Sequence, residues 1–156
     1  MSNELKIALI QSELYWEQPE ANRNSFQNKI NAIPETVDLI VLPEMFTSGF
    51  TMNAKPVAEA MNGSTVNWLR DTAQQKNAAI TGSLVIKEHG NYYNRLVFVH
   101  PDGHLDHYDK RHTFTLAGEH KIYTSGKDQI IVDYKGWKIK PLICYDLRFP
   151  VWARNT

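Results

Sequence analysis

The chain has little cysteine and no net charge. Its 156 residues contain one cysteine, Cys144, so no internal disulfide can form, and this favours a reducing compartment. The 17 lysine and arginine residues balance 17 aspartate and glutamate residues, so the long-range field that gathers polyanions or anionic lipid is missing. We therefore expect neither nucleic acid nor a membrane as a partner.

Long apolar runs are also missing. No stretch approaches the roughly 18 consecutive apolar residues of a membrane span, and the first residues, MSNE, lack the basic start and apolar run of a signal peptide. At 42% hydrophobic and 22% charged residues, the composition is that of a folded globule of about one domain. Together these features predict one domain over residues 1–156, soluble and cytoplasmic.

Apolar periodicity predicts a strand, a helix and a strand in the first part of the chain. Residues 5–10 (LKIALI) and 37–42 (VDLIVL) are compact apolar runs, typical of central strands. Between them, Phe26, Ile30 and Ile33 recur at spacings of 4 and 3 in a polar segment, which indicates an amphipathic helix that a proline ends.

The remaining elements predict a mixed sheet. A second helix is expected to begin at a Ser64/Thr65 cap and to lead into a strand over residues 79–86. Two hairpins are expected after it, over residues 92–108 and 130–143. Alternating helices and strands followed by hairpins favour an α/β fold with a mixed sheet, covered by helices on one face.

Three side chains suited to nucleophilic chemistry each follow an apolar strand. Glu44 follows LIVLP, Lys110 follows HLDHYD and Cys144 follows KPLI. Open α/β sheets bind ligands outside the carboxyl ends of their strands, so the three are expected to meet. A neighbouring cation and a base would activate the thiol, and Lys110 and Glu44 supply these functions. Lys110 and the backbone N–H of Tyr145 could then hold an oxyanion.

Taken singly, each of these residues also has an ordinary structural interpretation. A lone cysteine after an apolar strand is more often a small buried hydrophobic residue without reactivity. Glu44 and Lys110, considered separately, are more often solvated charges or a weak ion pair. Only their joint placement and the surrounding sequence favour catalysis.

The surrounding sequence resembles the carbon-nitrogen hydrolase (nitrilase) superfamily over nearly the whole chain. The motifs that carry this resemblance are PEMF at residues 43–46, YDKRH at 108–112 and LICYDLRFP at 142–150. The segments at residues 43–50, 110–112 and 148–152 are most similar to the omega-amidase branch.

The resemblance implies a Glu44–Lys110–Cys144 triad, with Glu119 as a further acid that orients the substrate and supports the lysine. It also implies a homodimer that hydrolyses ω-monoamides of dicarboxylic acids, such as 2-oxoglutaramate and 2-oxosuccinamate, through a Cys144 thioester and without a cofactor. Two alternatives stay open: a nitrile or N-carbamoyl hydrolase with the same triad, and a catalytically silent fragment that acts as a binding or assembly module.

Chain length separates this sequence from the family. Family chains are much longer, whereas this one stops at Thr156, where the helix after the nucleophile should begin. We therefore expect the N-terminal portion of the family's α-β-β-α sandwich, incomplete at its C-terminus, with one face of a sheet partly uncovered.

Several other residues are candidates for substrate binding. Arg148 could clamp a substrate carboxylate, because its planar guanidinium matches that group, and Arg111 could do likewise. Phe46 and Phe114 could form walls of the pocket. The alternatives are that each arginine binds groups of its own loop and that the aromatic rings are plain core.

A metal site is not expected from the histidine spacing. His100, His104 and His107 suggest zinc, but residues 104 and 107 on one strand point to opposite faces. No cysteine or carboxylate cluster completes a tetrahedral set in the sequence. His112 is instead kept as a residue that could support Lys110.

Overall fold

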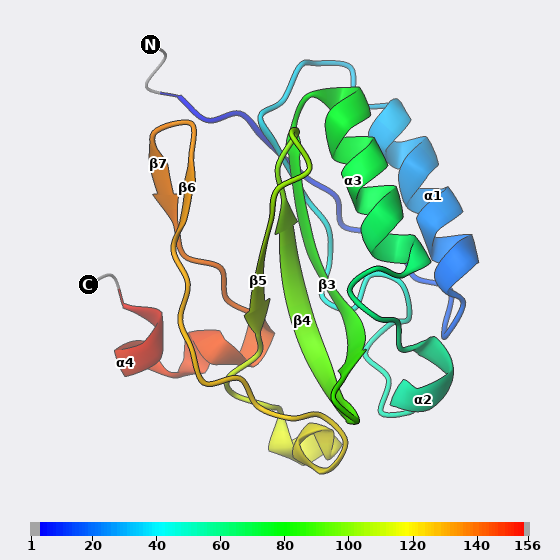
Figure 1. Cartoon of the computed structure of the whole chain (residues 1–156), viewed down its shortest axis with the longest axis vertical. Helices are drawn as coiled ribbons and strands as arrows, with labels where there is room; N and C mark the ends of the chain where they lie inside the picture. The colour runs from blue at the N-terminus through cyan, green and yellow to red at the C-terminus, as the bar shows by residue number, and fades with distance from the viewer. Residues whose placement is uncertain (1–3, 155–156) are drawn as a thin grey trace.

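The computed structural model describes residues 4–154 and contains a five-stranded sheet with helices on one face (Figure 1). The strands lie in chain order: β1 (Ile7–Leu9), β2 (Leu39–Val41), β3 (Ala79–Glu88), β4 (Asn91–Val99) and β5 (Leu105–Asp109). β1, β2 and β3 pair in parallel, whereas β3, β4 and β5 pair antiparallel. The predicted mixed sheet of an α/β fold is confirmed.

Two long helices cover one face of this sheet (Figure 1). α1 (Pro19–Asn31) and α3 (Ser64–Lys76) contact each other and direct an apolar stripe toward β2, β3 and β4. The stripe arises because side chains three and four residues apart share one side of a helix. Its fully buried members are Phe26, Ile30, Val66, Leu69 and Ala73.

The start of α3 is predicted correctly, but the capping group is different. Ser64 is the first helical residue and Gly63 precedes it as N-cap, with no side-chain cap of its own. The carboxylate of Glu59 instead accepts the backbone N–H of Thr65 at 2.8 Å. A carboxylate from outside the helix therefore satisfies one of the free N–H groups of the first turn.

A separate hairpin lies on the other side of the sheet (Figure 1). It consists of β6 (Val132–Tyr134) and β7 (Trp137–Ile139). The Tyr134 hydroxyl donates to the Asp38 carbonyl at 2.9 Å and accepts the Ala79 N–H at 3.2 Å. This hairpin partly covers the face opposite the helices. The buried residues of the second core are Leu39, Ala79, Leu96, Phe98, Tyr108, Val132, Tyr134 and Ile143.

The remaining elements are short. They are α2 (Ala54–Val57), α4 (Pro150–Ala153) and three 3₁₀ turns, Thr115–Ala117, Glu119–Lys121 and Cys144–Arg148. Among residues 4–154, no helix has the length and apolar character needed to cross a membrane.

Two strand predictions are wrong. β2 is a buried inner strand as predicted, but β1 is an edge strand, with Leu9 76% exposed. An apolar run of six residues does not distinguish an edge strand from an inner one, because both bury at least one face. The second hairpin is also shorter than predicted: β7 ends at Ile139, so residues 140–143 approach Cys144 outside any strand.

The loop after β2 contributes an aromatic side chain to the helix-side core. Phe46 is fully buried and contacts Phe26 and Trp68, with ring centroids 5.7 and 6.0 Å away. The residue on β3 beneath it is Gly82, where a Cβ would lie only 2.9 Å from both Leu42 and Phe46. The missing side chain at Gly82 thus lets the loop pack closely onto the sheet.

We predict that Phe46→Ala lowers the free energy of unfolding by about 3–5 kcal/mol, because it leaves a cavity in a dry core. Phe46→Leu, which fills most of that volume, should cost clearly less. Urea denaturation followed by circular dichroism measures both. The matched control is Leu116→Ala: Leu116 is 88% exposed, so its loss should change stability by no more than about 0.5 kcal/mol. Equal losses at the two positions would contradict this packing.

Candidate active site

The turn that carries Glu44 is held against β3. The backbone N–H of Leu42 donates to the Thr81 carbonyl at 2.8 Å, and the N–H of Met45 donates to the Ser83 hydroxyl at 2.9 Å. Met45 has a φ of 47°, a left-handed value that few residues other than glycine adopt. The chain therefore turns sharply directly after Glu44, and the Glu44 side chain remains 21% exposed.

Lys110 follows β5 and reaches Glu44 across the sheet. β5 is antiparallel to β4, which is antiparallel to β3, so β5 runs in the same direction as β2. The carboxyl ends of β2 and β5 therefore lie at one edge, as the sequence predicts. The Lys110 ammonium is 1% exposed and donates to Glu44 Oε1 at 2.8 Å and to Glu119 Oε2 at 2.9 Å.

Glu119 is the fully buried acid of this group. It begins a 3₁₀ turn after Gly118, whose φ of 76° directs the chain back toward the sheet. Its side chain is 0% exposed and accepts hydrogen bonds from Lys110, from the amide of Asn94 at 3.2 Å and from the N–H of Phe114 at 2.5 Å. Each carboxylate oxygen thus has a hydrogen-bond donor, as a buried polar group requires.

Asn94 connects the two acids, and the sequence analysis missed it. Its Nδ2 donates to Glu44 Oε1 at 2.8 Å and to Glu119 Oε1 at 3.2 Å. Its Oδ1 is the buried side-chain atom that has no hydrogen-bond partner among residues 4–154. A signal was available, because alternation along β4 places Asn94 on the same face as the apolar Leu96 and Phe98. A polar residue in an inward-facing position needs polar partners.

Cys144 lies at the entrance to a pocket next to Glu44. It begins the 3₁₀ turn Cys144–Arg148 with a φ of 43°, and the residue is exposed. Cys144 and Glu44 line one pocket of about 130 Å³, whose walls also come from the end of β2, from β3 and β4, and from residues 142–143. A left-handed conformation at a residue other than glycine is a strained geometry that the surrounding structure has to hold.

The charge cluster changes the pKa of the thiol. Partial burial raises the pKa of the Cys144 thiol, the negative charge of Glu44 raises it further, and Lys110 lowers it by a smaller amount. For Lys110, burial lowers the pKa, but the attraction and hydrogen bonds of Glu44 and Glu119 outweigh burial and raise it. Lys110 therefore carries a positive charge near neutral pH, and the carboxylates of Glu44 and Glu119 balance this charge. Lys110 favours the thiolate, as a neighbouring cation should, but burial and the charge of Glu44 outweigh this effect.

Asp146 holds the turn Cys144–Arg148 against the segment after β5. It is fully buried and accepts four hydrogen bonds: from the Tyr108 hydroxyl at 2.7 Å, the His112 N–H and Nδ1 at 2.9 Å each, and the Ile143 N–H at 3.1 Å. One carboxylate therefore joins the end of β5 to the residues flanking Cys144. The sequence alone does not reveal this role of Asp146, because nothing local distinguishes a buried acid from an exposed one.

The residues predicted to bind substrate, two arginines and two phenylalanines, are not among those that line this pocket. Arg148 is exposed to solvent. Arg111 instead donates a hydrogen bond to the backbone carbonyl of Gly126 at 3.1 Å. Phe114 packs against Tyr145 with ring centroids 5.1 Å apart. Phe46 lies in the helix-side core and does not line the pocket, which supports its alternative interpretation as plain core.

Comparisons with known proteins agree with this geometry. A sequence model of the carbon-nitrogen hydrolase family matches residues 6–155. The chain is 47% identical to omega-amidase YafV of Escherichia coli (strain K12) over 151 residues, 97% of this chain and 58% of that protein. It is 30% identical to 2-oxoglutaramate amidase of Bacillus subtilis (strain 168) over 152 residues, 96% of this chain and 59% of that protein.

A solved structure is similar over almost the whole chain. It is a CN-hydrolase superfamily protein from Xanthomonas campestris with an arsenic adduct in its active site, and the two chains superpose with a TM-score of 0.95 at 44% identity. The match covers 99% of this chain and 58% of that one. The chain thus spans less than two thirds of the length of these relatives.

We predict that Asp146→Ala destabilises the protein by about 2–4 kcal/mol, because it leaves several buried donors without an acceptor. Asp146→Asn keeps the shape but accepts fewer hydrogen bonds, so it should cost less. Thermal and urea denaturation measure both losses. The control is Asp133→Asn, since the Asp133 side chain is 74% exposed in a surface ion pair and should contribute little. An Asp146→Ala protein as stable as this control would contradict the role of Asp146.

Proposed function

The chain belongs to the carbon-nitrogen hydrolase family, and on this premise we propose that the protein hydrolyses the terminal amide of small ω-monoamides of dicarboxylic acids, of the 2-oxoglutaramate and 2-oxosuccinamate type. One observation carries the proposal: Glu44 belongs both to the buried ion cluster of Lys110 and to the pocket that Cys144 lines. The ω-monoamide class is supported by the omega-amidase and the 2-oxoglutaramate amidase among the relatives.

The first step is attack by Cys144 sulfur on the amide carbon. Because its raised pKa keeps the thiol protonated near neutral pH, a base has to remove the proton as the C–S bond forms. We assign the role of this base to Glu44, since it lines the pocket with Cys144 and retains some solvent exposure. Glu119 is fully buried and has a donor at each oxygen, so it holds Lys110 in position rather than exchanging protons with substrate.

The oxyanion that develops needs donors in a fixed position. A lysine ammonium has three N–H donors, and the hydrogen bonds of Lys110 to Glu44 and Glu119 use two of them. The third N–H is assigned to the substrate oxygen, together with the backbone N–H of Tyr145, which follows the nucleophile. Donors placed before the reaction stabilise the developing charge without reorganisation.

Collapse of the tetrahedral intermediate completes acylation. The C–N bond breaks, Glu44 returns the proton to the leaving nitrogen, and ammonia departs from a Cys144 thioester. Glu44 then takes a proton from water, which attacks the thioester carbon, and the released thiol is protonated again. The sum is amide plus water giving carboxylic acid plus ammonia, and no step requires a metal or an organic cofactor.

The remaining assignments concern recognition and assembly. Arg148 is exposed near the nucleophile turn and is proposed to bind the distal carboxylate of the substrate, with Phe114 beside Tyr145 forming a wall. The resemblance to the family also supports a cytoplasmic homodimer.

The direct test is a panel of variants and substrates. Cys144→Ser should reduce ammonia release from 2-oxoglutaramate by at least about 10³-fold with little change in fold, and Glu44→Gln should reduce it by about 10²–10⁴-fold. Ammonia release and mass spectrometry of the acylated protein measure these effects. Nitrile and N-carbamoyl substrates tested in parallel identify the second candidate activity.

Three results would contradict the proposal. Turnover retained by Cys144→Ser would exclude the thioester route, and a thioester formed by Glu44→Gln at the wild-type rate would place the base elsewhere. Absence of turnover on every substrate, in a folded wild-type protein, would favour the silent assembly module. The matched control is Glu35→Gln, an acid outside the site in an exposed loop, which should leave turnover unchanged.

A second prediction follows from the cause of the raised thiol pKa. Glu44→Gln removes a negative charge that raises the pKa of Cys144, so alkylation by iodoacetamide should begin at lower pH in this variant than in wild type. Reactivity toward iodoacetamide and turnover of amide should therefore change in opposite directions. Alkylation rates between pH 6 and about 10, near ordinary thiol pKa values, measure the shift. An unchanged or higher midpoint would show that Glu44 does not influence the thiol.

A further inference from the structure

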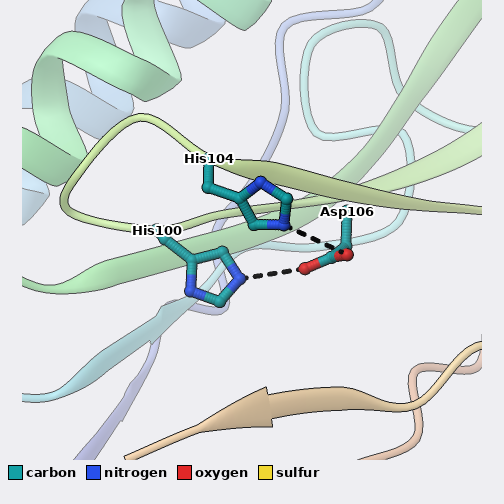
Figure 2. A group of neighbouring side chains, drawn as sticks. All are labelled: His100, His104 and Asp106. Carbon is teal, nitrogen blue, oxygen red and sulfur yellow. Dashed lines mark hydrogen bonds and ion pairs between the residues drawn. The ribbon is translucent and has the colours of Figure 1, made fainter.

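Three potential metal ligands meet at the turn between β4 and β5. His100 follows β4 and His104 precedes β5, and the backbone N–H of His100 donates to the His104 carbonyl at 2.8 Å. Asp106 lies opposite Phe98 in the β4–β5 register. Because side chains alternate along a strand, Phe98, His100, His104 and Asp106 all lie on the same face of the sheet. Figure 2 shows both imidazole rings directed at the Asp106 carboxylate.

We propose that His100, His104 and Asp106 form a binding site for one divalent transition-metal ion of the zinc type. His100 Nε2 lies 2.9 Å from Asp106 Oδ2 and His104 Nε2 lies 3.5 Å from Asp106 Oδ1. One ligand atom from each residue falls within 4.8 Å of the other two. Ligands about 2.0–2.1 Å from a tetrahedral zinc ion are about 3.4 Å apart. The two separations run to different oxygens of the Asp106 carboxylate, and the three side chains are close enough for small ring and carboxylate rotations to bring one atom of each to an ion.

The chemistry of the set fits such an ion. Two imidazole nitrogens and one carboxylate oxygen are ligands that zinc, cobalt and nickel accept, and they differ from the all-oxygen sites of calcium and magnesium. The carboxylate also provides a negative charge that partly balances the ion. Three protein ligands leave a fourth position for water, and the His104 side chain, 63% exposed, opens the site to solvent on that side.

The His100 side of the site is held in place by packing and by a hydrogen bond in the turn. His100 is 13% exposed, and its ring packs against Phe98 at 5.0 Å and Tyr134 at 5.5 Å between centroids. The Asp102 carboxylate accepts the backbone N–H of His104 at 2.9 Å and thereby holds the turn. Because His100 is packed in this way, less side-chain conformational entropy is lost on binding an ion than for three exposed ligands.

The proposed site differs from the expectation drawn from the sequence, which rested on residues of a single strand. His104 and His107 do face opposite sides of β5, but the third ligand is Asp106, two residues from His104 on the same face. His100 joins them across the turn. Hairpin geometry, rather than spacing along one strand, brings the ligands together. A metal-free alternative exists, in which the Asp106 carboxylate only accepts hydrogen bonds from the two imidazole rings.

Binding of one ion distinguishes the two interpretations. Metal-free protein, prepared with a chelator in a Cys144→Ser background so that the thiol cannot bind metal, is titrated with Zn²⁺ in a calorimeter. We expect one ion per chain, and a loss of at least about tenfold in affinity in His104→Ala and in Asp106→Asn. His107→Ala is the matched control, because it removes an exposed imidazole from the same strand but from the opposite face, and it should bind as well as its parent.

Two further readouts keep the test independent of activity. Co²⁺ in place of zinc should give a visible absorption band with the parent protein and with His107→Ala, and this band should be absent in His104→Ala. Zn²⁺ should also raise the Tm of the parent but not that of His104→Ala. Circular dichroism checks that the variants are folded. Absence of saturable binding, or equal loss of binding in His107→Ala, would overturn the proposal and leave Asp106 as a hydrogen-bond acceptor only.

Discussion

A buried ammonium held between two carboxylates is the interaction on which the rest of this structure depends. Removing such charges from water costs several kcal/mol for each ion, and their attraction compensates for this only when the remaining hydrogen-bonding positions are filled. The amide of Asn94 and the N–H of Phe114 fill them around Glu44 and Glu119. Because Lys110 is neutralised in this way, it acts as a hydrogen-bond donor and does not lower the pKa of Cys144 enough to offset burial and Glu44.

The fold holds this cluster by joining elements that are distant in sequence. β2 and β5 end at the same edge of the sheet, and β3 lies beside β2, where Ser83 holds the turn that carries Glu44. The buried Asp146 then joins the end of β5 to the turn of Cys144, because it accepts hydrogen bonds from Tyr108, His112 and Ile143. Apolar cores on both faces of the sheet surround the buried hydrogen bonds of Lys110, Glu119 and Asp146. In such low-dielectric surroundings a hydrogen bond is stronger than in water.

Local patterns in the sequence predict most of the elements and single out Glu44, Lys110 and Cys144 as candidates, but they do not predict the contacts between them. Helical spacing around Phe26 and Ile30 and the apolar run that becomes β2 are properties of neighbouring residues, so α1 and β2 could be predicted. The edge position of β1 depends on which strand pairs with which, and the partners of Asn94 and Asp146 lie up to 50 residues away in the chain. The direction of the thiol pKa shift could not be predicted for the same reason, since it depends on the burial of Cys144 and on its distance from Glu44 and Lys110.

The two sites lie at opposite ends of the β4–β5 hairpin. Asn94 and Lys110 belong to the end at the pocket, whereas His100 and His104 belong to the turn. Six residues of extended chain separate Asn94 from His100, a distance of about 20 Å at the rise of a β-strand. An ion at the turn therefore makes no contact with substrate in the pocket and exerts little direct electrostatic force there, because this distance is about two and a half Debye lengths at physiological salt. A bound ion can influence the pocket only indirectly. It would join β4 to β5 at the turn and so restrain the hairpin whose other end carries Lys110.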